Sequence, residues 1–327
     1  TIDKLDECKL IKSTKGNNLY YHTNENSPAM MSAFTRKEIT LELADHLGIT
    51  KSSITTGTPC YLVFRHIKNL GGKLILDYKD NDYTMHIEAL MKEYNDYLNQ
   101  QKIVNEATGE IYEDIMIRRS YRDWNNNKKD FKFGGRGGGY WMDSKKVHRP
   151  SITINKSSTV ELDYNASKLN HLNLIVSGKH FERGVDVYSG IGDVDREVIK
   201  VLINTCILNS KSRGSSTARF KKMCEEDKEL NKLKSRSSLT TTQMVDMVEE
   251  KFNHLRQYFY RGNRLSEHVS WWEQNALFEI AVQAKRNGVV ALTVHDSFIV
   301  RKEDEGIMEM LMYSTYLPEI YQQHSLF

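Results

Sequence analysis

The feature that most restricts how this 327-residue chain can fold is an apolar run near its C-terminal end that polar residues interrupt. Residues 289–303 read VVALTVHDSFIVRKE, so His295, Asp296 and Ser297 stand between two stretches typical of a buried strand. A carboxylate in such a setting costs several kcal/mol unless a cation or a hydrogen-bond donor compensates it. The run therefore predicts a strand that carries a functional acid.

A second acid stands at the end of another predicted strand. Residues 151–164 read SITINKSSTVELDY, which predicts a strand around Ile152–Ile154, a polar turn at Asn155–Ser158 and a second strand from Thr159 to Tyr164. This β-hairpin ends on Asp163. Taken alone, an aspartate at a strand end is more often a cap or a turn ligand than a catalytic group.

Asp163 and Asp296 together support a more specific hypothesis. Two carboxylates on neighbouring strands are what two magnesium ions need, because one ion activates an attacking hydroxyl and the other stabilises a leaving pyrophosphate. The pair therefore indicates a two-metal site for Mg²⁺, with Mn²⁺ as the second candidate. We expect the two carboxylates to lie within about 5 Å of each other, as ions ~3.5–4 Å apart require.

Composition excludes several classes of protein. Hydrophobic residues make up 39% of the chain and charged residues 27%, and the mean hydropathy is −0.58. No apolar run approaches the ~20 residues of a membrane helix, and the N-terminal residues TIDKLDECKL lack the pattern of a secretory signal. We therefore expect a soluble, cytoplasmic protein without a membrane partner. The four cysteines are too scattered to predict a zinc site or a disulfide framework.

The charge distribution requires any polyanion to be bound locally. The net charge is only +3, but between Lys211 and Arg236 nine basic residues face four acids. A basic cluster of this kind can contact phosphate groups, or it can simply be the solvated surface of a helix. The sequence leaves both readings open.

Helical periodicity recurs along the chain. It predicts helices over residues 84–100, 193–209, 240–260 and about 270–286. Residues 34–54 also carry this periodicity, and the spacing of Ala44, Gly48 and Ile54 is similar to that of a DNA-binding helix-turn-helix. The alternative for this segment is an ordinary helical hairpin packed on the core.

Three segments, in this order, resemble the polymerase motifs A, B and C. VELDYNASKLNHL at 160–172 resembles motif A, and LTVHDSFIV at 292–300 resembles motif C, of the family A DNA polymerases and the single-subunit RNA polymerases of phages and mitochondria. Between them, Arg196 and Lys200 have the Arg-x-x-x-Lys spacing of motif B. A segment from Tyr121 to Trp141 is similar to one that precedes the palm in small polymerase-like proteins of phages and integrative elements.

The resemblance implies a fold and its division. It covers residues 118–305, roughly 60% of the chain. It implies an α+β, right-hand polymerase with an antiparallel palm sheet in residues 118–327 and a helical fingers insertion at about 190–265. Residues 1–117 are then a mostly helical N-terminal region that includes the candidate helix-turn-helix.

The resemblance also assigns roles to individual residues. Asp163 and Asp296 are the catalytic metal ligands, Tyr164 offers its main-chain carbonyl to the metals, and His295 lies near the primer end. The remaining roles go to basic residues: Arg196 and Lys200, on one face of a helix at i and i+4, hold the triphosphate, and the template and primer contact Arg122, Arg136 and Lys168.

The function expected from these roles is template-directed nucleotidyl transfer by a minimal DNA polymerase or primase of a phage or mobile element. Its partners are template, primer and nucleoside triphosphates, with a small accessory protein supplying surfaces that so short a chain lacks. Lys168 and Leu208 replace the family's sugar-discriminating glutamate and aromatic residue, which predicts weak selection between ribo- and deoxyribonucleotides. The alternative is a non-catalytic, DNA-binding replication initiator that keeps the palm as a scaffold.

Overall fold

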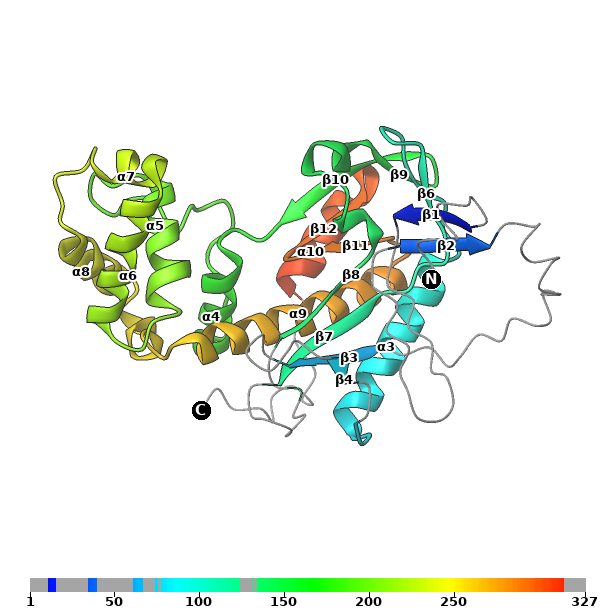
Figure 1. The fold of residues 1–327 in the computed structure, drawn as a ribbon, viewed down its shortest axis with the longest axis horizontal. Helices are drawn as coiled ribbons and strands as arrows, with labels where there is room; N and C mark the ends of the chain where they lie inside the picture. Colours follow the sequence, from blue (N-terminus) through cyan, green and yellow to red (C-terminus); the bar gives the residue numbers. More distant parts are fainter. Residues whose placement is uncertain are drawn as a thin grey trace.

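The computed structural model describes residues 11–15, 35–39, 61–66, 74–75, 78–123, 131 and 134–314 (Figure 1). Its strands are β1 (Ile11–Lys15), β2 (Thr35–Ile39), β3 (Leu62–His66), β4 (Leu74–Ile75), β5 (Ile103–Asn105), β6 (Glu110–Tyr112), β7 (Arg118–Asp123), β8 (Gly134–Gly138), β9 (Ile152–Ile154), β10 (Ser157–Asp163), β11 (Leu292–Val294) and β12 (Ser297–Arg301). Its α-helices are α3 (Asp82–Leu98), α4 (Ser167–Ser177), α5 (Arg196–Val201), α6 (Arg213–Glu226), α7 (Lys228–Lys234), α8 (Thr241–Lys251), α9 (Asn263–Arg286) and α10 (Glu305–Ser314).

The main sheet is antiparallel and has six strands in the order β11-β12-β10-β9-β5-β6. In the second half of β10 the sequence alternates, because Leu162 is buried whereas Glu161 and Asp163 on either side of it are exposed. The turn between β9 and β10 uses positive φ angles at Asn155 and its neighbour, as a tight hairpin requires. The expected mixed α+β fold with an antiparallel sheet is thus confirmed.

Helices α3, α9 and α10 pack with this sheet around one hydrophobic core. A capping box at Asn81 starts α3, whose apolar face carries Ile87 and Met91 into that core. The hydroxyl of Tyr94 on α3 donates to the carbonyl of Ala291 just before β11, 2.5 Å away, which ties the helix to the sheet. A second, four-stranded sheet in the order β4-β3-β7-β8 lies against α9 through β8.

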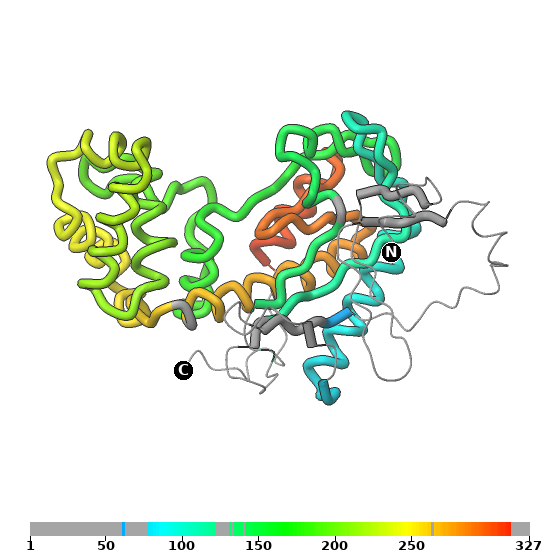
Figure 2. The backbone as a smooth tube through the Cα atoms, in the orientation of Figure 1, coloured from blue at the N-terminus to red at the C-terminus, as the bar shows by residue number. Residues whose placement is uncertain are grey.

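A helical body with its own hydrophobic core stands beside the sheet. The chain leaves the sheet after β10, forms α4 to α8 and returns along α9 (Figure 2). The core of this body extends from Leu169 to Val269, so it includes the expected insertion at 190–265 and adds α4 and the start of α9. Residues of α9 from Trp271 onward belong to the core of the sheet instead.

Residues before 118 differ from the mostly helical region expected there. Among those that the structure describes, six strands accompany a single helix. Residues 35–39 were expected to begin a helix-turn-helix, but they form strand β2. Their extended backbone is hydrogen-bonded to the antiparallel strand β1. Residues 40–60, which include Ala44, Gly48 and Ile54, lie outside the described residues.

The expected boundary at residue 117 runs through one sheet. Strands β5 and β6, which precede it, pair with β9, which follows it. The apolar face of α3 packs on α9 and belongs to the same hydrophobic core as that sheet. None of the described helices is long and apolar enough to cross a bilayer.

Candidate active site

Asp163 and Asp296 come from adjacent strands of the main sheet. Asp163 is the last residue of β10, and the register pairs it with Ser297, the first residue of β12. Residues directly opposite each other in an antiparallel pair have Cα atoms about 4.5–5.5 Å apart. Because Asp296 immediately precedes Ser297, the sheet presents both aspartates at one end of the β10–β12 pair.

His295 and Asp296 occupy a two-residue turn between β11 and β12, not the interior of a strand as expected from the sequence. The pairing of Val294 with Ser297 closes this hairpin, and His295 has a φ of +54°. In a turn, the backbone N–H and C=O groups of these two residues do not have to pair with a neighbouring strand. Their polar side chains therefore need not be buried in the sheet. His295 and Asp296 therefore do not point to opposite faces of one strand.

Side chains from β10 and α9 hold this turn. The buried side chain of Gln274 on α9 donates from Nε2 to the carbonyl of His295, 2.9 Å away. The Ser297 hydroxyl lies 2.8 Å from a carboxylate oxygen of Glu161 and 2.9 Å from the carbonyl of Val294. The sequence analysis missed Gln274 and Glu161 as parts of the site.

The site carries more negative charge than the two aspartates alone. Partial burial of the carboxyl, followed by the charges of Asp296 and Glu161, raises the pKa of Asp163 to about 6. Burial likewise raises the pKa of Glu273 on α9 to about 7, although a hydrogen bond from the Ser167 hydroxyl opposes the rise. Glu273 was also missed; its only signal was the polar Glu-Gln-Asn run inside the apolar sequence WWEQNALFEI.

Two expected template and primer residues lie around this acid cluster. Arg136 in β8 is exposed, and its positive charge lowers the pKa of Glu273 and, after burial, that of His295. Lys168 on α4 also lowers the pKa of Glu273, and its Nζ lies 3.2 Å from the hydroxyl of Ser266 on α9. For the third, Arg122, only the backbone in β7 is described.

Arg149 adds a cation that the sequence analysis did not identify. Its guanidinium lies 3.3 Å from the carboxylate of Glu161, and its charge helps to lower the pKa of His295. The carboxylate of Glu161 therefore contacts both Arg149 and the hydroxyl of Ser297, which begins β12.

Arg196 and Lys200 belong to the helical body and contact acids there. Arg196, the first residue of α5, pairs with Asp186 at 2.7 Å, and its guanidinium lies over the Tyr188 ring, 5.5 Å from the centroid. Lys200 lies 3.8 Å from Glu197. In the part of the chain that the structure describes, no ion pair joins either cation to the two aspartates.

Tyr188 contacts Arg196 and Asn204 in the helical body. Burial raises its pKa to about 12, and the Asp296 charge contributes to the rise. Its hydroxyl accepts a hydrogen bond from the side chain of Asn204, which lies in a π-helical segment, Leu202–Ile207. Segments of this kind often occur at functional sites.

The donors fit magnesium better than a softer metal. Carboxylates of Asp163 and Asp296, with the main-chain carbonyl expected at Tyr164, are hard oxygen ligands. Burial and then the neighbouring acids raise the pKa of Asp163, and a divalent cation would stabilise its ionised form. Within the described ranges, no group of three or more His, Cys, Asp or Glu residues could hold a metal by itself. Magnesium is commonly bound by one or two carboxylates together with substrate phosphates, which this arrangement allows.

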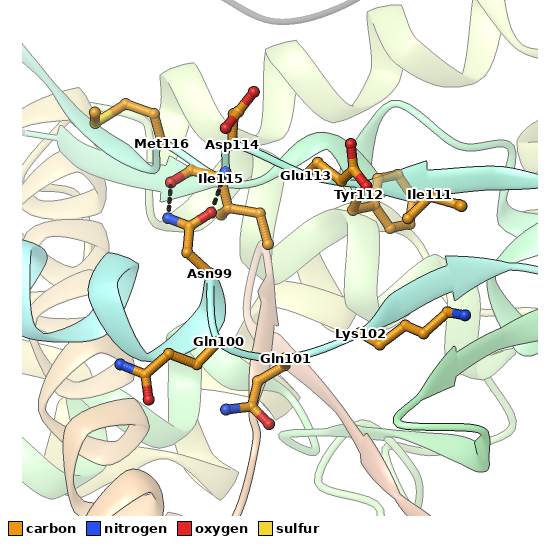
Figure 3. Close-up of a pocket in the computed structure, with 10 residues that line it drawn as sticks. All are labelled: Asn99, Gln100, Gln101, Lys102, Ile111, Tyr112, Glu113, Asp114, Ile115 and Met116. Atoms are coloured by element: carbon orange, nitrogen blue, oxygen red, sulfur yellow. Dashed lines mark hydrogen bonds between the residues drawn. The ribbon is translucent and has the colours of Figure 1, made fainter.

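A pocket of about 880 Å³ lies elsewhere, between the end of α3 and the β5–β6 hairpin (Figure 3). The amide of Asn99 spans it, accepting from the backbone of Ile115 at 2.6 Å and donating to the carbonyl of the same residue at 2.8 Å. Strand β6 forms the edge of the sheet opposite to β11. This pocket is therefore not part of the carboxylate site.

No family model matches the chain, and no curated protein matches it in sequence. The function must be argued from the geometry of the site itself.

Proposed function

We propose that the protein is a template-directed nucleotidyltransferase that uses two magnesium ions. One observation carries this proposal: the β10–β12 register pairs Asp163 with Ser297 and so presents Asp163 beside Asp296 in the adjoining turn. Two carboxylates that approach from neighbouring antiparallel strands suit a pair of metal ions better than a single structural ion. The antiparallel sheet and the separate helical body are consistent with the resemblance to polymerases.

Different residues of the chain would bind the metal ions and position the site. Asp163 and Asp296 bind the ions, and the Tyr164 carbonyl adds an oxygen ligand. When bound, the ions supply an activated primer hydroxyl and charge neutralisation at the leaving pyrophosphate. Gln274 keeps the catalytic turn in place through the carbonyl of His295.

Cations on both sides of the acids would receive the substrates. Arg136 and Lys168, which lie within electrostatic reach of Glu273, contact the template or primer backbone. Arg196 and Lys200 bind the triphosphate, exchanging their acidic partners Asp186 and Glu197 for phosphate oxygens. Lys168 contacts Ser266 on α9. Because it stands where the family has a sugar-discriminating glutamate, weak selection against ribonucleotides is part of the proposal.

Incorporation of labelled nucleotides on single-stranded DNA, with and without a primer, tests the proposal. Asp163→Asn and Asp296→Asn should each reduce incorporation by about a hundred- to a thousandfold, roughly the loss seen when a single preorganised catalytic group is removed. The matched control is Asp143→Asn, which removes an exposed aspartate from the loop after β8. This control should keep the activity of the unchanged protein.

Two results would contradict the proposal. One is equal incorporation by the Asp163→Asn variant and the unchanged protein. The other is tight DNA binding without incorporation under any primer or metal condition, which would favour the replication initiator. Parallel reactions with ribo- and deoxyribonucleotides on one template measure sugar selection, and a preference beyond about a thousandfold would show that a gate exists.

A further inference from the structure

A cluster of aromatic rings with one cation stands next to Asp163. It consists of Tyr164, His180, Tyr313 and Arg183, and we call it the aromatic shelf. The rings of Tyr164 and His180 are stacked, with an interplanar angle of 16° and centroids 6.0 Å apart. Tyr313, in the last turn of α10, meets the edges of both, at 5.6 Å and 5.3 Å.

Arg183 covers one face of the Tyr313 ring. Its guanidinium carbon lies 5.9 Å from the ring centroid, within the range of a cation–π contact. The carboxylate of Glu309, one turn earlier on α10, pairs with the same guanidinium and holds it there. Arg183 is exposed, and Tyr313 and His180 are half-buried, so this edge of the shelf reaches the surface.

The shelf is connected to the catalytic carboxylate by short covalent and hydrogen-bonded paths. Tyr164 follows Asp163 directly, and its hydroxyl donates to the carbonyl of Met312, the residue before Tyr313. Partial burial raises the pKa of Tyr313, the Arg183 charge opposes the rise, and the charges of Glu309 and Asp163 add to it. The Tyr313 hydroxyl therefore lies within electrostatic reach of Asp163.

The proposed function explains the metal ligands and the cations, but it assigns nothing to Tyr313, His180 or Arg183. We propose that the aromatic shelf is a stacking site for a nucleobase, placed so that the attached sugar or phosphate reaches Asp163. This inference rests on the proposed function for the identity of the ligand. The base can come from the incoming nucleotide or from the primer end, since both present the same π face beside the metal site.

The chemistry of the shelf favours a nucleobase over other ligands. Aromatic side chains beside a basic group are a common way to bind nucleic acid without reading its sequence, because every base has a π face. A guanidinium also stacks on bases, so Arg183 and Tyr313 offer two surfaces of the same kind. An anionic group alone would not need three rings, and an apolar ligand would not suit a site bordered by Arg183, Glu309 and Asp163.

Fluorescence titration measures stacking without turnover. In one arm the probe is a nucleoside triphosphate that carries 2-aminopurine, and in the other it is a primed template with 2-aminopurine at the primer end. Tyr313→Ala should raise the Kd for one of the two probes by roughly 5- to 150-fold, the effect expected for one stacked base. Tyr313→Phe keeps the ring and should stay within about twofold of the unchanged protein.

The matched control is Tyr97→Ala. Tyr97 on α3 is also half-buried and also lies under a cation, with Lys285 Nζ 6.0 Å from its centroid, but it is remote in sequence and structure from Asp163. This control should bind both probes as the unchanged protein does. If Tyr313→Ala does not fold, as judged by circular dichroism, the exposed Arg183→Gln variant replaces it and should weaken the same probe.

The outcomes separate the stacking site from the polymerase proposal. Unchanged Kd values for both probes in Tyr313→Ala, or equal losses in Tyr313→Ala and Tyr97→Ala, overturn the stacking site while leaving the Asp163→Asn assay to judge catalysis. A selective loss of 2-aminopurine quenching in Tyr313→Ala supports the stacking site even in a protein that incorporates no nucleotide. The two proposals can therefore fail independently.

Discussion

The ionised carboxylate of Asp163 lowers the stability of the folded protein. Burial of the carboxyl, followed by the charges of Asp296 and Glu161, raises its pKa to about 6, above the ordinary value of 3.8. A raised pKa means that the folded chain binds the proton more tightly than the unfolded chain does. The stability present when Asp163 is protonated is therefore lost progressively as the pH rises from about 4 through 6.

This linkage predicts that a variant lacking the charge is more stable at high pH. Asp163→Asn should melt above the unchanged protein at pH 8, by about 2–4 °C for each kcal/mol of repulsion removed, and nearly with it at pH 4. Thermal melts followed by circular dichroism at the two pH values provide the measurement. Asp143→Asn should shift the melting temperature at neither pH, and an Asp163→Asn variant less stable at pH 8 would refute the repulsion.

The same variant provides a metal test that does not depend on activity. Any ligand that binds only the folded state raises its stability. Millimolar Mg²⁺ should therefore raise the melting temperature of the unchanged protein at pH 8 and have little effect on Asp163→Asn. Equal shifts in both proteins would place the bound metal elsewhere.

Among the elements, α9 determines how the His295–Asp296 turn is held. His295 adopts a positive φ, which is unfavourable for a residue other than glycine, so the turn depends on outside support. Gln274 supplies it with a hydrogen bond to the carbonyl of His295, and its neighbour Glu273 receives the Ser167 hydroxyl from α4. One helix thus contacts the turn, the acid cluster and the helix that follows β10.

Removing the Gln274 hydrogen bond should reduce catalysis more than it reduces stability. Gln274→Leu keeps the size of the side chain but frees the turn, and a misplacement of about 1 Å at a reacting group can cost up to roughly a hundredfold in rate. We expect kcat for nucleotide incorporation to fall at least tenfold while the circular dichroism spectrum is kept. Gln283→Leu, on the same helix and away from the turn, is the control and should retain kcat; equal loss in both variants would indicate damage to α9 as a whole.

For the molecule as a whole, two hydrophobic cores share one long helix. The core of the sheet contains Trp141 and Trp271, whereas the core of the helical body contains Phe220 and has no tryptophan between residues 142 and 270. Because α9 enters both cores, the helical body can move relative to the sheet only by bending or displacing this helix.

In a destabilised variant, the two cores should unfold at different urea concentrations. Phe220→Ala removes a fully buried ring from the helical body and should cost about 3–5 kcal/mol there. In a urea titration, helical circular dichroism should then fall at a lower denaturant concentration than tryptophan fluorescence, which reports the sheet core. Ile154→Val in the sheet core is the control and should shift the fluorescence transition; coincident transitions in Phe220→Ala would show one cooperative unit.

Much of the main sheet could be predicted from the sequence. The alternation around Val160–Asp163 and the turn at Asn155 depend on neighbours in the chain, so the β9–β10 hairpin was predicted nearly to its ends. The α+β class with an antiparallel sheet was implied by the resemblance to polymerases, and the structure has both features. The polar interruption at His295–Asp296 was predicted to lie inside a strand, whereas the structure places it in a turn, because the pairing of β11 with β12 depends on hydrogen bonds across the hairpin.

What only the tertiary structure decided is the surroundings of the two aspartates. Glu273, Gln274 and Tyr313 read as ordinary helical residues, and they matter because α9 and α10 pack against the end of β10. The pairing of β5 with β9, which joins residues on either side of 117, also depends on long-range packing, since a strand pairs with whichever partner buries its apolar face, however distant in the chain. Local sequence determines periodicity, turns and the positions of the acids, whereas long-range packing determines which charges and rings those acids meet.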